Sequence, residues 1–310
     1  MHTSTLTRVV VITAIIAGAA LGIAAIIGLA TGTFMTGGLR GVGGLDVDER
    51  KSVPASGAAL ISIETVSERI RIQDGTGDAV EAWFHGTVHA SNPDAVPLLS
   101  VDRTGSTIDI GLARKRPWNL GWHWGPLVLE VSVPKGYAGR LSVKGVSADI
   151  DLADHAYEGL ALSTVSGDLK VGAVKAGDFA AHTTSGELRA SAVTAERLEL
   201  SSVSGGIEVK SMTGNVRAHT TSGEVTLAFE AAPPEIEIGS TSGEVTLRFP
   251  ADAGFRLDAR STSGDVTCGF PIQISESRTG GGQHALTGMV GSGSSAVTVR
   301  TVSGGIRVQR

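Results

Sequence analysis

Apolar and polar residues alternate in short runs through the C-terminal half of the chain, and each run is interrupted by a Ser-Gly pair. The phrase Ser/Thr-Val/Thr-Ser-Gly recurs with its central glycine at Gly167, Gly186, Gly205, Gly223, Gly243, Gly264 and Gly304. The gaps between these glycines are 19, 19, 18, 20, 21 and 40 residues, the last being about two periods. Alternation with period two is typical of β-strands. A short β-rich unit at this period predicts a solenoid, whose coils bury their apolar faces by stacking on one another.

The alternation within each unit predicts two strands joined by an arc. An apolar residue lies six positions before each motif serine, at Ile61, Leu141, Leu160, Phe179, Leu198, Val216, Ile236, Leu257 and Val297. Leu160 and Leu162 share one face with Thr164. After the glycine, Leu169 and Val171 continue on that face from odd-numbered positions. The alternation therefore slips by one residue at Ser-Gly, through a bend for which glycine is expected to supply the backbone freedom.

Two earlier segments fit the same unit: 61–72, with Arg69 where the glycine would be, and 141–152, with Ala148 in that place. Residues 73–140 form a longer departure between them. The return from each motif to the next unit varies in length, so one edge of the solenoid is fixed and the other takes the insertions. The expected fold is all-β, a parallel β-solenoid (right-handed β-helix) with roughly 19-residue coils. Its inward ladder is expected to contain Leu169, Leu188, Ile207, Val225, Val245 and Val266.

Residues 9–30 form an uncharged, apolar stretch of 22 residues. Roughly 20 such residues span a bilayer, whereas a cleaved signal peptide has a shorter apolar core and a small-residue cleavage site. We therefore expect an uncleaved transmembrane helix, with the short tail before it in the cytoplasm and the rest outside, although the positive-inside signal is weak. The predicted organisation is a cytoplasmic tail at 1–8, an anchor at 9–30, a Gly-rich linker at 31–54 and the solenoid at 55–310.

Composition narrows the functional classes. Aromatic residues make up only 4% of the chain, which suits a narrow interior filled by aliphatic side chains. The net charge of −5 is mild and no basic run occurs, which argues against a nucleic-acid partner. The single cysteine, Cys268, excludes an intrachain disulfide, and its register with Val171 and Leu247 predicts a small buried hydrophobe rather than a nucleophile. No cofactor is expected.

Three features carry a resemblance to a known family. They are the stretch LVLEVSVPKGYAGRLSVKGVSADIDL at 127–152, the tandem Thr-x-Ser-Gly repeats, and the ending GMVGSGSSAVTVRTVSGGI at 288–306. Over roughly residues 55–310 the chain resembles the bacterial putative-adhesin family of β-strand-repeat proteins of unknown function. The resemblance implies a surface-exposed or membrane-anchored β-solenoid with no established enzymatic activity. Because a fold does not establish a function, "adhesin" is a label by analogy.

Carboxylates follow most motif glycines, at Asp168, Glu187, Glu224, Glu244 and Asp265. Coils stacked in register would place them in a column about 4.8 Å apart. Such a column could bind calcium, but a calcium site needs several oxygens converging on one ion, and the Gly-rich repeat of calcium-binding β-rolls is absent. We favour a solvated ridge whose like charges discourage lateral aggregation. No metal site is predicted.

The same repeat argues against enzymatic activity. Solenoid enzymes that cleave glycans need clustered acids, often with Arg or Lys, on one face. Here the acids recur with the repeat, and His182 and His219 recur within the same phrase, Ala-His-Thr-Thr-Ser-Gly-Glu. Their recurrence indicates a structural feature of the unit. No catalytic residue is therefore predicted.

The segment 113–126 stands apart from the repeat, because it contains three of the four tryptophans and a cationic triplet. One interpretation is a cap that covers an open end of the solenoid. The other is a contact surface, in which tryptophan and cationic side chains meet sugar rings, anionic wall polymers or lipid headgroups. The residues predicted to contact a ligand or the membrane are Arg114, Lys115, Arg116, Trp118, Trp122 and Trp124.

Together these features predict a non-enzymatic, single-pass protein of the cell membrane, whose extracytoplasmic β-solenoid acts as a scaffold or as a binding and adhesion module. Its expected partners are the membrane, through residues 9–30, and a cell-wall polymer, an anionic lipid or a neighbouring membrane protein. Two alternatives stay open. One is an envelope-stress or signalling component that binds a neighbouring membrane protein, and the other is a solenoid enzyme acting on cell-wall or extracellular glycan.

Overall fold

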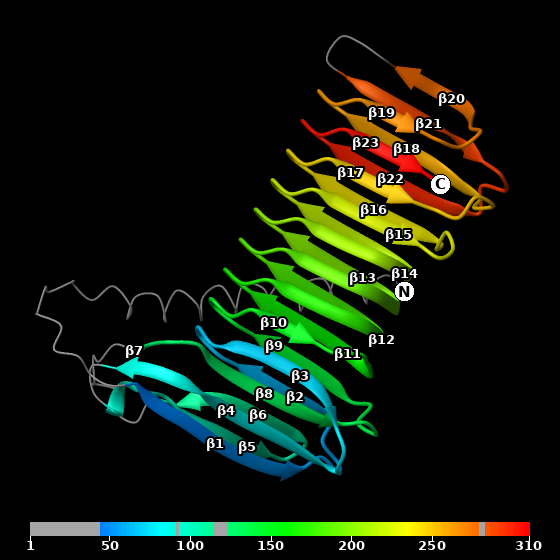
Figure 1. Ribbon diagram of the computed structural model, residues 1–310. Coiled ribbons are helices and arrows are strands. Elements are labelled where there is room, and N and C mark those ends of the chain that lie inside the picture. Colours follow the sequence, from blue (N-terminus) through cyan, green and yellow to red (C-terminus); the bar gives the residue numbers. More distant parts are fainter. Residues whose placement is uncertain (1–43, 91–92, 114–122, 279–282) are drawn as a thin grey trace, which may run out of the picture.

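The computed structural model describes residues 44–90, 93–113, 123–278 and 283–310. Within these ranges the chain forms 23 strands and one 3-10 turn, η1 (Pro93–Ala95), so the all-β class is confirmed (Figure 1). The predicted tail at 1–8, the anchor at 9–30 and the linker up to residue 43 lie outside the described residues. In the part of the chain that is described, no helix is long and apolar enough to cross a membrane.

Two stacks of parallel strands run along the molecule, joined in each coil by the motif arc (Figure 1). The stack before the motif contains, in spatial order, β6 (Thr107–Ala113), β2 (Leu60–Glu64), β9 (Arg140–Lys144), β11 (His155–Thr164), β12 (Leu169–Thr183), β13 (Leu188–Ser202), β14 (Ile207–Thr220), β16 (Glu235–Ser240), β22 (Ser295–Thr301) and β18 (Phe255–Ser261). The stack after the motif contains β8 (Leu127–Pro134), β3 (Arg69–Gly75), β10 (Ile150–Leu152), β12, β13, β14, β15 (Val225–Phe229), β17 (Val245–Arg248), β23 (Ile306–Gln309) and β19 (Val266–Cys268). The expected parallel pairing of coils is thus confirmed.

Antiparallel strands complete the two ends of the molecule. At one end, β5 (Leu98–Thr104) pairs with β6, and β4 (Ala79–Ala90) lies between β8 and β1 (Leu45–Pro54). At the other end, β21 (His284–Val290) pairs with β18 and with β20 (Gln273–Arg278). The expected linker boundary at residue 54 is therefore wrong, because residues 45–54 form β1 and alternate Leu45, Val47 and Val53 toward the core.

The interior is a set of ladders in which one apolar side chain from each coil packs on the next. The ladder after the motif runs Ile70, Ile150, Leu169, Leu188, Ile207, Val225, Val245, Ile306 and Val266. Its members up to Ile306 are at most 1% exposed, and burying each such side chain contributes roughly 1.5–3 kcal/mol. The predicted ladder is confirmed with one correction, since Ile306 lies between Val245 and Val266.

In six of the arcs, the first residue of the motif closes the arc with its hydroxyl group. This Thr or Ser is buried, and its oxygen accepts a hydrogen bond of 2.7–3.0 Å from the N–H of the motif glycine three residues later. The pairs are Thr183 with Gly186, Ser202 with Gly205, Thr220 with Gly223, Ser240 with Gly243, Ser261 with Gly264 and Thr301 with Gly304. The motif requires Thr or Ser here because a buried backbone N–H needs a partner.

The motif glycines allow successive arcs to approach closely. None of them has a positive φ, so the expected explanation by backbone freedom is wrong. A Cβ added to Gly205 would lie within 3.0 Å of the carbonyl oxygen of Gly186 in the neighbouring coil, and the other motif glycines meet the same obstacle.

In the 61–72 coil it is Glu68, not Arg69 as expected, that occupies the glycine position. Its carboxylate accepts a hydrogen bond from the N–H of Ser67 at 2.9 Å.

Replacing Thr183 by valine should lower the free energy of unfolding by about 1–2 kcal/mol, because the buried N–H of Gly186 would lose its acceptor while the side-chain volume is kept. The control is Thr184→Val, at a surface position where other coils carry valine, and its effect should stay within about 0.5 kcal/mol. Urea unfolding of the full-length protein in detergent measures both values. Equal effects of the two substitutions would contradict this role for the hydroxyl.

The return edge is more regular than expected in the middle of the stack. β12, β13 and β14 each continue around it without a break, so these coils have a third hydrogen-bonded side rather than two strands and a loop. The shorter coil, β14, follows β13 with a register shift between Thr194 and Arg197. Gly214 lies opposite this shift with a φ of 122°, a conformation that side chains other than glycine rarely adopt.

The order of coils in space differs from their order in the sequence at both ends. The last coil, β22–β23, lies between the coil of β16–β17 and the coil of β18–β19. Likewise the first coil, β2–β3, lies between β6 and β9 in one stack and between β8 and β10 in the other. The 40-residue gap before Gly304 is therefore not two regular coils. It holds the β20–β21 hairpin, after which the chain turns back into the stack.

Candidate functional site

The segment predicted to contact a ligand is only partly described. Arg114, Lys115, Arg116, Trp118 and Trp122 lie outside the described residues, so their role stays a prediction. The backbone of Trp124 lies in β7 (His123–Trp124), which pairs antiparallel with His89–Ala90 at the end of β4. This pairing attaches the C-terminal end of the segment to the sheet formed by β1, β4 and β8.

The carboxylates after the motif glycines bond to neighbouring coils. An Asp149 oxygen accepts a hydrogen bond from the N–H of Asp168 at 3.1 Å, and an Asp168 oxygen accepts one from the N–H of Glu187 at 3.0 Å. Arginine side chains form ion pairs with three carboxylates of this column, namely Arg69 with Asp149, Arg189 with Glu187 and Arg307 with Glu244. Among the described residues, no group of three or more His, Cys, Asp or Glu side chains is placed to hold a metal ion. The column therefore holds coils together.

The pKa of Asp149 lies below its ordinary value of 3.8, because the N–H of Asp168 and the guanidinium of Arg69 favour its charged form. A lowered pKa in the folded state gives stability above the unfolded pKa that is lost as the pH falls through the folded value. The Asp149→Asn variant should therefore be less stable than the wild type at pH 7, and the difference should begin to shrink as the pH falls below about 3.8 and should vanish only below the lowered pKa of Asp149 in the folded state. Urea titrations at several pH values measure it, with Asp252→Asn in an exposed turn as the control. A difference that does not change with pH would contradict this.

One serine–histidine pair has the geometry of a nucleophile and its base. The Nδ1 of His182 lies 2.5 Å from the Oγ of Ser201 in the next coil, and burial lowers the pKa of His182, so its neutral ring can accept a proton. A working relay also needs a group that orients the second ring nitrogen and donors for an oxyanion. In the described part of the chain, no carboxylate is hydrogen-bonded to the His182 ring. The pair thus links two coils.

Both ring nitrogens of His155 are engaged in structural contacts. The Nδ1 of His155 lies 2.7 Å from an Asp74 carboxylate oxygen, and its Nε2 lies 2.9 Å from the carbonyl oxygen of Tyr137. The His155 side chain is 6% exposed and its ring lies against Tyr157. An acid–histidine pair is the beginning of a catalytic triad, but here the second nitrogen faces a backbone carbonyl rather than a nucleophile. His155 therefore joins β3, β11 and the turn after β8.

Cys268 points inward in the register that was predicted, opposite Val308 of the last coil. It is half-buried rather than fully buried, because β19 is the last strand of its stack. Burial still raises the pKa of its thiol, which reduces the thiolate fraction at neutral pH.

A groove on the outer face of β1, β4, β8 and β3 is the best candidate for ligand binding. It encloses about 440 Å³ and is lined by Arg50, Lys51, Ser52, Gln73, Glu81, Ala82, Trp83, Glu130 and Ser132. Glu81 and Gln73 are both register partners of Ser132, so the three lie side by side on three adjacent strands. The described structure gives these three side chains no hydrogen-bond partner. They offer one carboxylate, one hydroxyl and one amide to a ligand.

Trp83 forms a wall of this groove rather than a stacking platform. Its Nε1 donates a hydrogen bond to Asp48 at 2.7 Å, and the Arg50 guanidinium lies 4.1 Å from the ring centroid. The His85 ring stacks on it with centroids 3.8 Å apart. The sequence pattern does not predict this groove, because the groove needs strands from residues 45–54 and 127–134 that no local pattern brings together.

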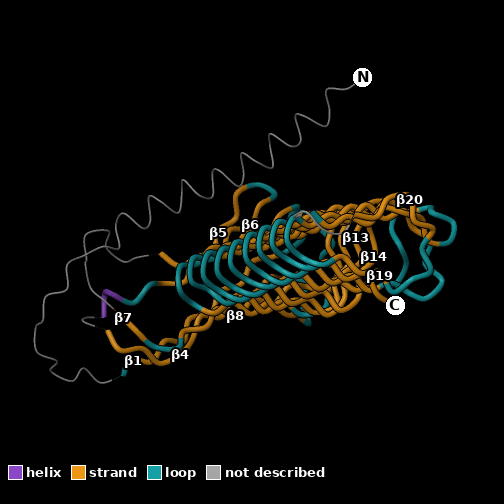
Figure 2. Tube along the Cα trace, turned by 90° about the horizontal axis from the view of Figure 1, so that it is seen from above, coloured by secondary structure: helices purple, strands orange, loops and turns teal. Residues whose placement is uncertain are grey.

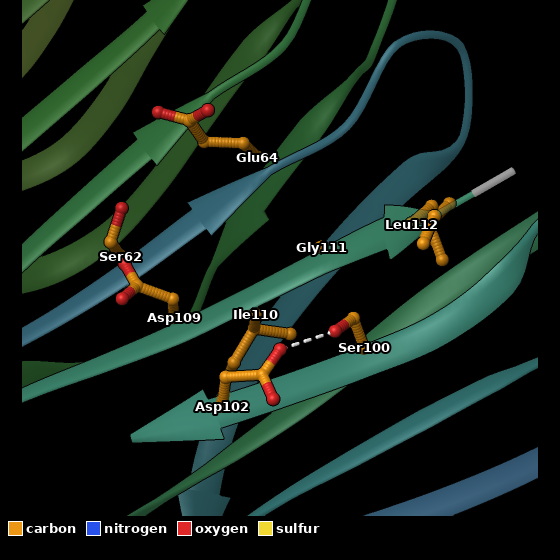
Figure 3. Close-up of a pocket in the computed structure, with 9 residues that line it drawn as sticks. Ser62, Glu64, Ser100, Asp102, Asp109, Ile110, Gly111 and Leu112 are labelled. Carbon is orange, nitrogen blue, oxygen red and sulfur yellow. Dashed lines mark hydrogen bonds between the residues drawn. The ribbon is translucent and has the colours of Figure 1, made fainter. Parts of the chain in front are cut away.

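A second, shallower depression of about 300 Å³ lies between β2, β5 and β6 (Figure 3). Its polar lining includes Glu64, Asp102 and Asp109. Asp102 and Asp109 are direct cross-strand partners, and the Oγ of Ser100 donates a hydrogen bond to Asp102 at 2.5 Å. Glu64 is paired with Lys144 at 3.0 Å. Two carboxylates opposite each other repel any anionic ligand, so this depression is the weaker candidate.

Comparison with known proteins shows the family. No curated protein matches the chain. The solved structures that match the chain include a putative adhesin from Bacteroides fragilis NCTC 9343, with TM-score 0.47 and 14% identity over 84% of this chain and 97% of that one. They also include a putative adhesin from Parabacteroides merdae ATCC 43184, with TM-score 0.42 and 11% identity over 84% and 95% of the two chains. A putative lipid binding protein from Parabacteroides distasonis ATCC 8503 has TM-score 0.42 and 12% identity over 84% and 96%. The family model described as Toastrack DUF4097 matches residues 59–309, in agreement with the expected resemblance, and the chain therefore belongs to the Toastrack DUF4097 family.

Proposed function

We propose that this protein is a non-enzymatic binding module, held at the cell membrane by residues 9–30 with its coils on the outer side. The observation that carries the proposal is that two sets of polar side chains differ in their contacts: one set is bonded between coils, and the other faces an open groove. The groups that resemble catalytic or metal-binding residues are bonded between coils, as at His155, the His182–Ser201 pair and the column containing Asp149. Glu81, Ser132 and Gln73, by contrast, face the outer groove together.

The groove suits a hydroxyl-rich polymer such as a cell-wall glycan. It presents donors and acceptors side by side, and a sugar ring offers both kinds of group along each edge. The groove is also set in regular strands, which hold binding side chains more firmly than loops do. It lies beside β1, which is the first described strand after residues 9–30 in the chain. We also propose that the coils wind in a right-handed sense, because connections between parallel strands of one sheet are almost always right-handed.

The double variant Gln73→Ala/Ser132→Ala tests the groove directly. Full-length protein in detergent is incubated with insoluble wall material, and the bound fraction is measured by sedimentation. Losing two hydrogen bonds should weaken binding about tenfold at an unchanged melting temperature. The matched control is Thr226→Ala/Gln309→Ala, which removes the same two kinds of polar group from the outer face of the same stack.

Other outcomes of this assay identify the alternatives. Soluble fragments released from the wall material would indicate a glycan enzyme and overturn the proposal. Binding that is equal in wild type, variant and control would place the contact elsewhere, and the triple variant Trp118→Ala/Trp122→Ala/Trp124→Ala would then test the other predicted surface. The location is tested separately, because protease added to intact cells should remove the part of the chain after residue 44.

A further inference from the structure

The motif arcs stack along the molecule and form a row of turns in Figure 2. Their outward side chains form three parallel columns along this row. In most of the repeat arcs the buried residues are the first Thr or Ser and the glycine, for example Thr183 and Gly186. The residues between them, here Thr184 and Ser185, form the crest, and His182 and Glu187 lie outward on its two sides. We name the crest with its two flanking columns the arc face.

The crest combines a column of serine hydroxyl groups with exposed valine side chains. Its serine column contains Ser67, Ser147, Ser166, Ser185, Ser204, Ser222, Ser242, Ser303 and Ser263 in spatial order. The residue before each serine is Val or Thr, and Val66, Val203 and Val302 are 48%, 40% and 48% exposed. They are three of the six large hydrophobic side chains that are exposed in the described part of the chain.

The flanking columns carry charges of complementary sign. The column before the crest is Glu64, Lys144, Ser163, His182, Ser201, His219, Gly239, Arg300 and Arg260. The column after the crest is Arg69, Asp149, Asp168, Glu187, Gly206, Glu224, Glu244, Gly305 and Asp265. Read coil by coil, an acid in one column always meets a cation, a histidine or a neutral residue in the other. In the coil of Glu64 and Arg69 the acid lies before the crest and the cation after it, whereas in the next coil the cation Lys144 lies before the crest and the acid Asp149 after it.

We propose that the arc face binds the arc face of a second copy of this chain, with the two solenoids side by side and parallel. A two-fold axis along the stack brings the column before the crest of one copy opposite the column after the crest of the other. Glu64 then meets Arg69 of the other copy, Lys144 meets Asp149, and Arg260 meets Asp265. The coil spacing of about 4.8 Å is matched automatically, since both partners have the same repeat.

The charges exclude the other simple arrangements. In an antiparallel pair the acidic column would face the acidic column of the second copy. A parallel pair shifted by one coil would bring Arg69 opposite Lys144 and Glu64 opposite Asp149. The ion pairs Arg69–Asp149 and Glu64–Lys144 run along the columns and leave these side chains 37–60% exposed for a partner. Arg260 pairs instead with Asp258 of its own strand at 2.9 Å, and its side chain stays 53% exposed.

The interface is long enough for a specific dimer. A stable interface buries about 800 Å² on each partner, which is about 90 Å² for each of nine coils and comes from two crest residues and their flanks. The arrangement places β1 of both copies at the same end, as two chains anchored in one membrane require. The inference goes beyond the proposed function, because it concerns the assembly of the protein and not the ligand of the groove.

Site-directed cross-linking tests the arrangement in the full-length protein in detergent. In a Cys268→Ser background, single cysteines replace Ser185, Ser204 or Ser242 on the crest, and Thr194→Cys on the return edge is the control. A short thiol cross-linker should join two copies at all three crest positions and not at the control. Joining at Ser204 alone would show an antiparallel pair, and joining at no crest position would show that the arc face is no interface. Either result overturns the proposal.

Charge reversal provides the second readout. Arg260→Glu should weaken the dimer about tenfold in sedimentation equilibrium, because the substitution creates two repulsive contacts with Asp265 across the axis. Adding Asp265→Lys should restore the dimer, whereas Asp265→Lys alone should weaken it. A wild-type protein that is monomeric at about 10 μM, or a double variant no better than Arg260→Glu, would contradict the proposal.

Discussion

Ending the chain after residue 294 should destabilise the protein by more than about 5 kcal/mol, far more than the loss of one terminal coil. The missing residues form β22 and β23, which lie inside the stack between the coils of β16–β17 and β18–β19. Their removal leaves the inward side chains of two further coils without neighbours, and each of these side chains contributes roughly 1.5–3 kcal/mol when buried. Residues 249–294 then lose their parallel partners in both stacks.

Limited proteolysis and thermal unfolding of the chain that ends at residue 294 measure this effect, with the full-length protein as the reference. We expect cleavage to remove everything after about residue 249 and the melting temperature to fall sharply. Deleting only the exposed Arg310 is the control and should change little. A truncated chain that keeps β18–β19 protected would show that these strands pack directly on β16–β17, contrary to the order described above.

Replacing Gly205 by alanine should cost at least about 3 kcal/mol, because the added methyl group would collide with the carbonyl oxygen of Gly186 in the neighbouring coil. Both partners are backbone atoms held by strands, so neither can move aside cheaply. The next residue supplies the control, since a Cβ at Gly206 would meet nothing closer than 3.5 Å. Urea unfolding should therefore leave Gly206→Ala within about 0.5 kcal/mol of the wild type. Similar losses in both variants would contradict close approach as the reason for the motif glycine.

The local sequence pattern predicted the coils well because each coil must bury apolar side chains on one face in the same way. The six-residue offset before the motif serine and the slip at Ser-Gly placed Leu160, Leu169 and Leu188 in the core, where all are at most 3% exposed. The reason for the glycine was predicted wrongly. The cause is the distance between neighbouring arcs, which is a property of the stack and is invisible in one repeat.

The order of the coils could not be predicted from the repeat. Val245, Ile306 and Val266 have the same pattern, and any of the three could follow another in a ladder. The signals that decide the order are the lengths of the excursions. The 73–140 and 265–294 segments are long enough to form hairpins that carry the chain beyond the end of the stack and back into it.

The candidate groove could not be predicted from the sequence for a related reason. Gln73 and Glu81 are only eight residues apart, but Ser132 lies about 50 residues further along the chain, and the three residues lie on strands of two different directions. Residues 45–54 were assigned to a linker because the preceding residues are rich in glycine, yet they supply Arg50 to the groove. The arc face, in contrast, was present in the sequence as alternating charges on either side of each motif.

Hydrogen exchange at the arcs tests most directly the central claim that the motif is a structural device. The N–H groups of Gly186, Gly205, Gly223, Gly243 and Gly304 donate to buried hydroxyls, so their exchange should be as slow as that of the strand amides around them. Added calcium should leave these rates unchanged, because the carboxylates beside the arcs already bond to neighbouring coils. Fast exchange at the arcs that becomes slow when calcium is added would contradict the account and would make the motif a binding site.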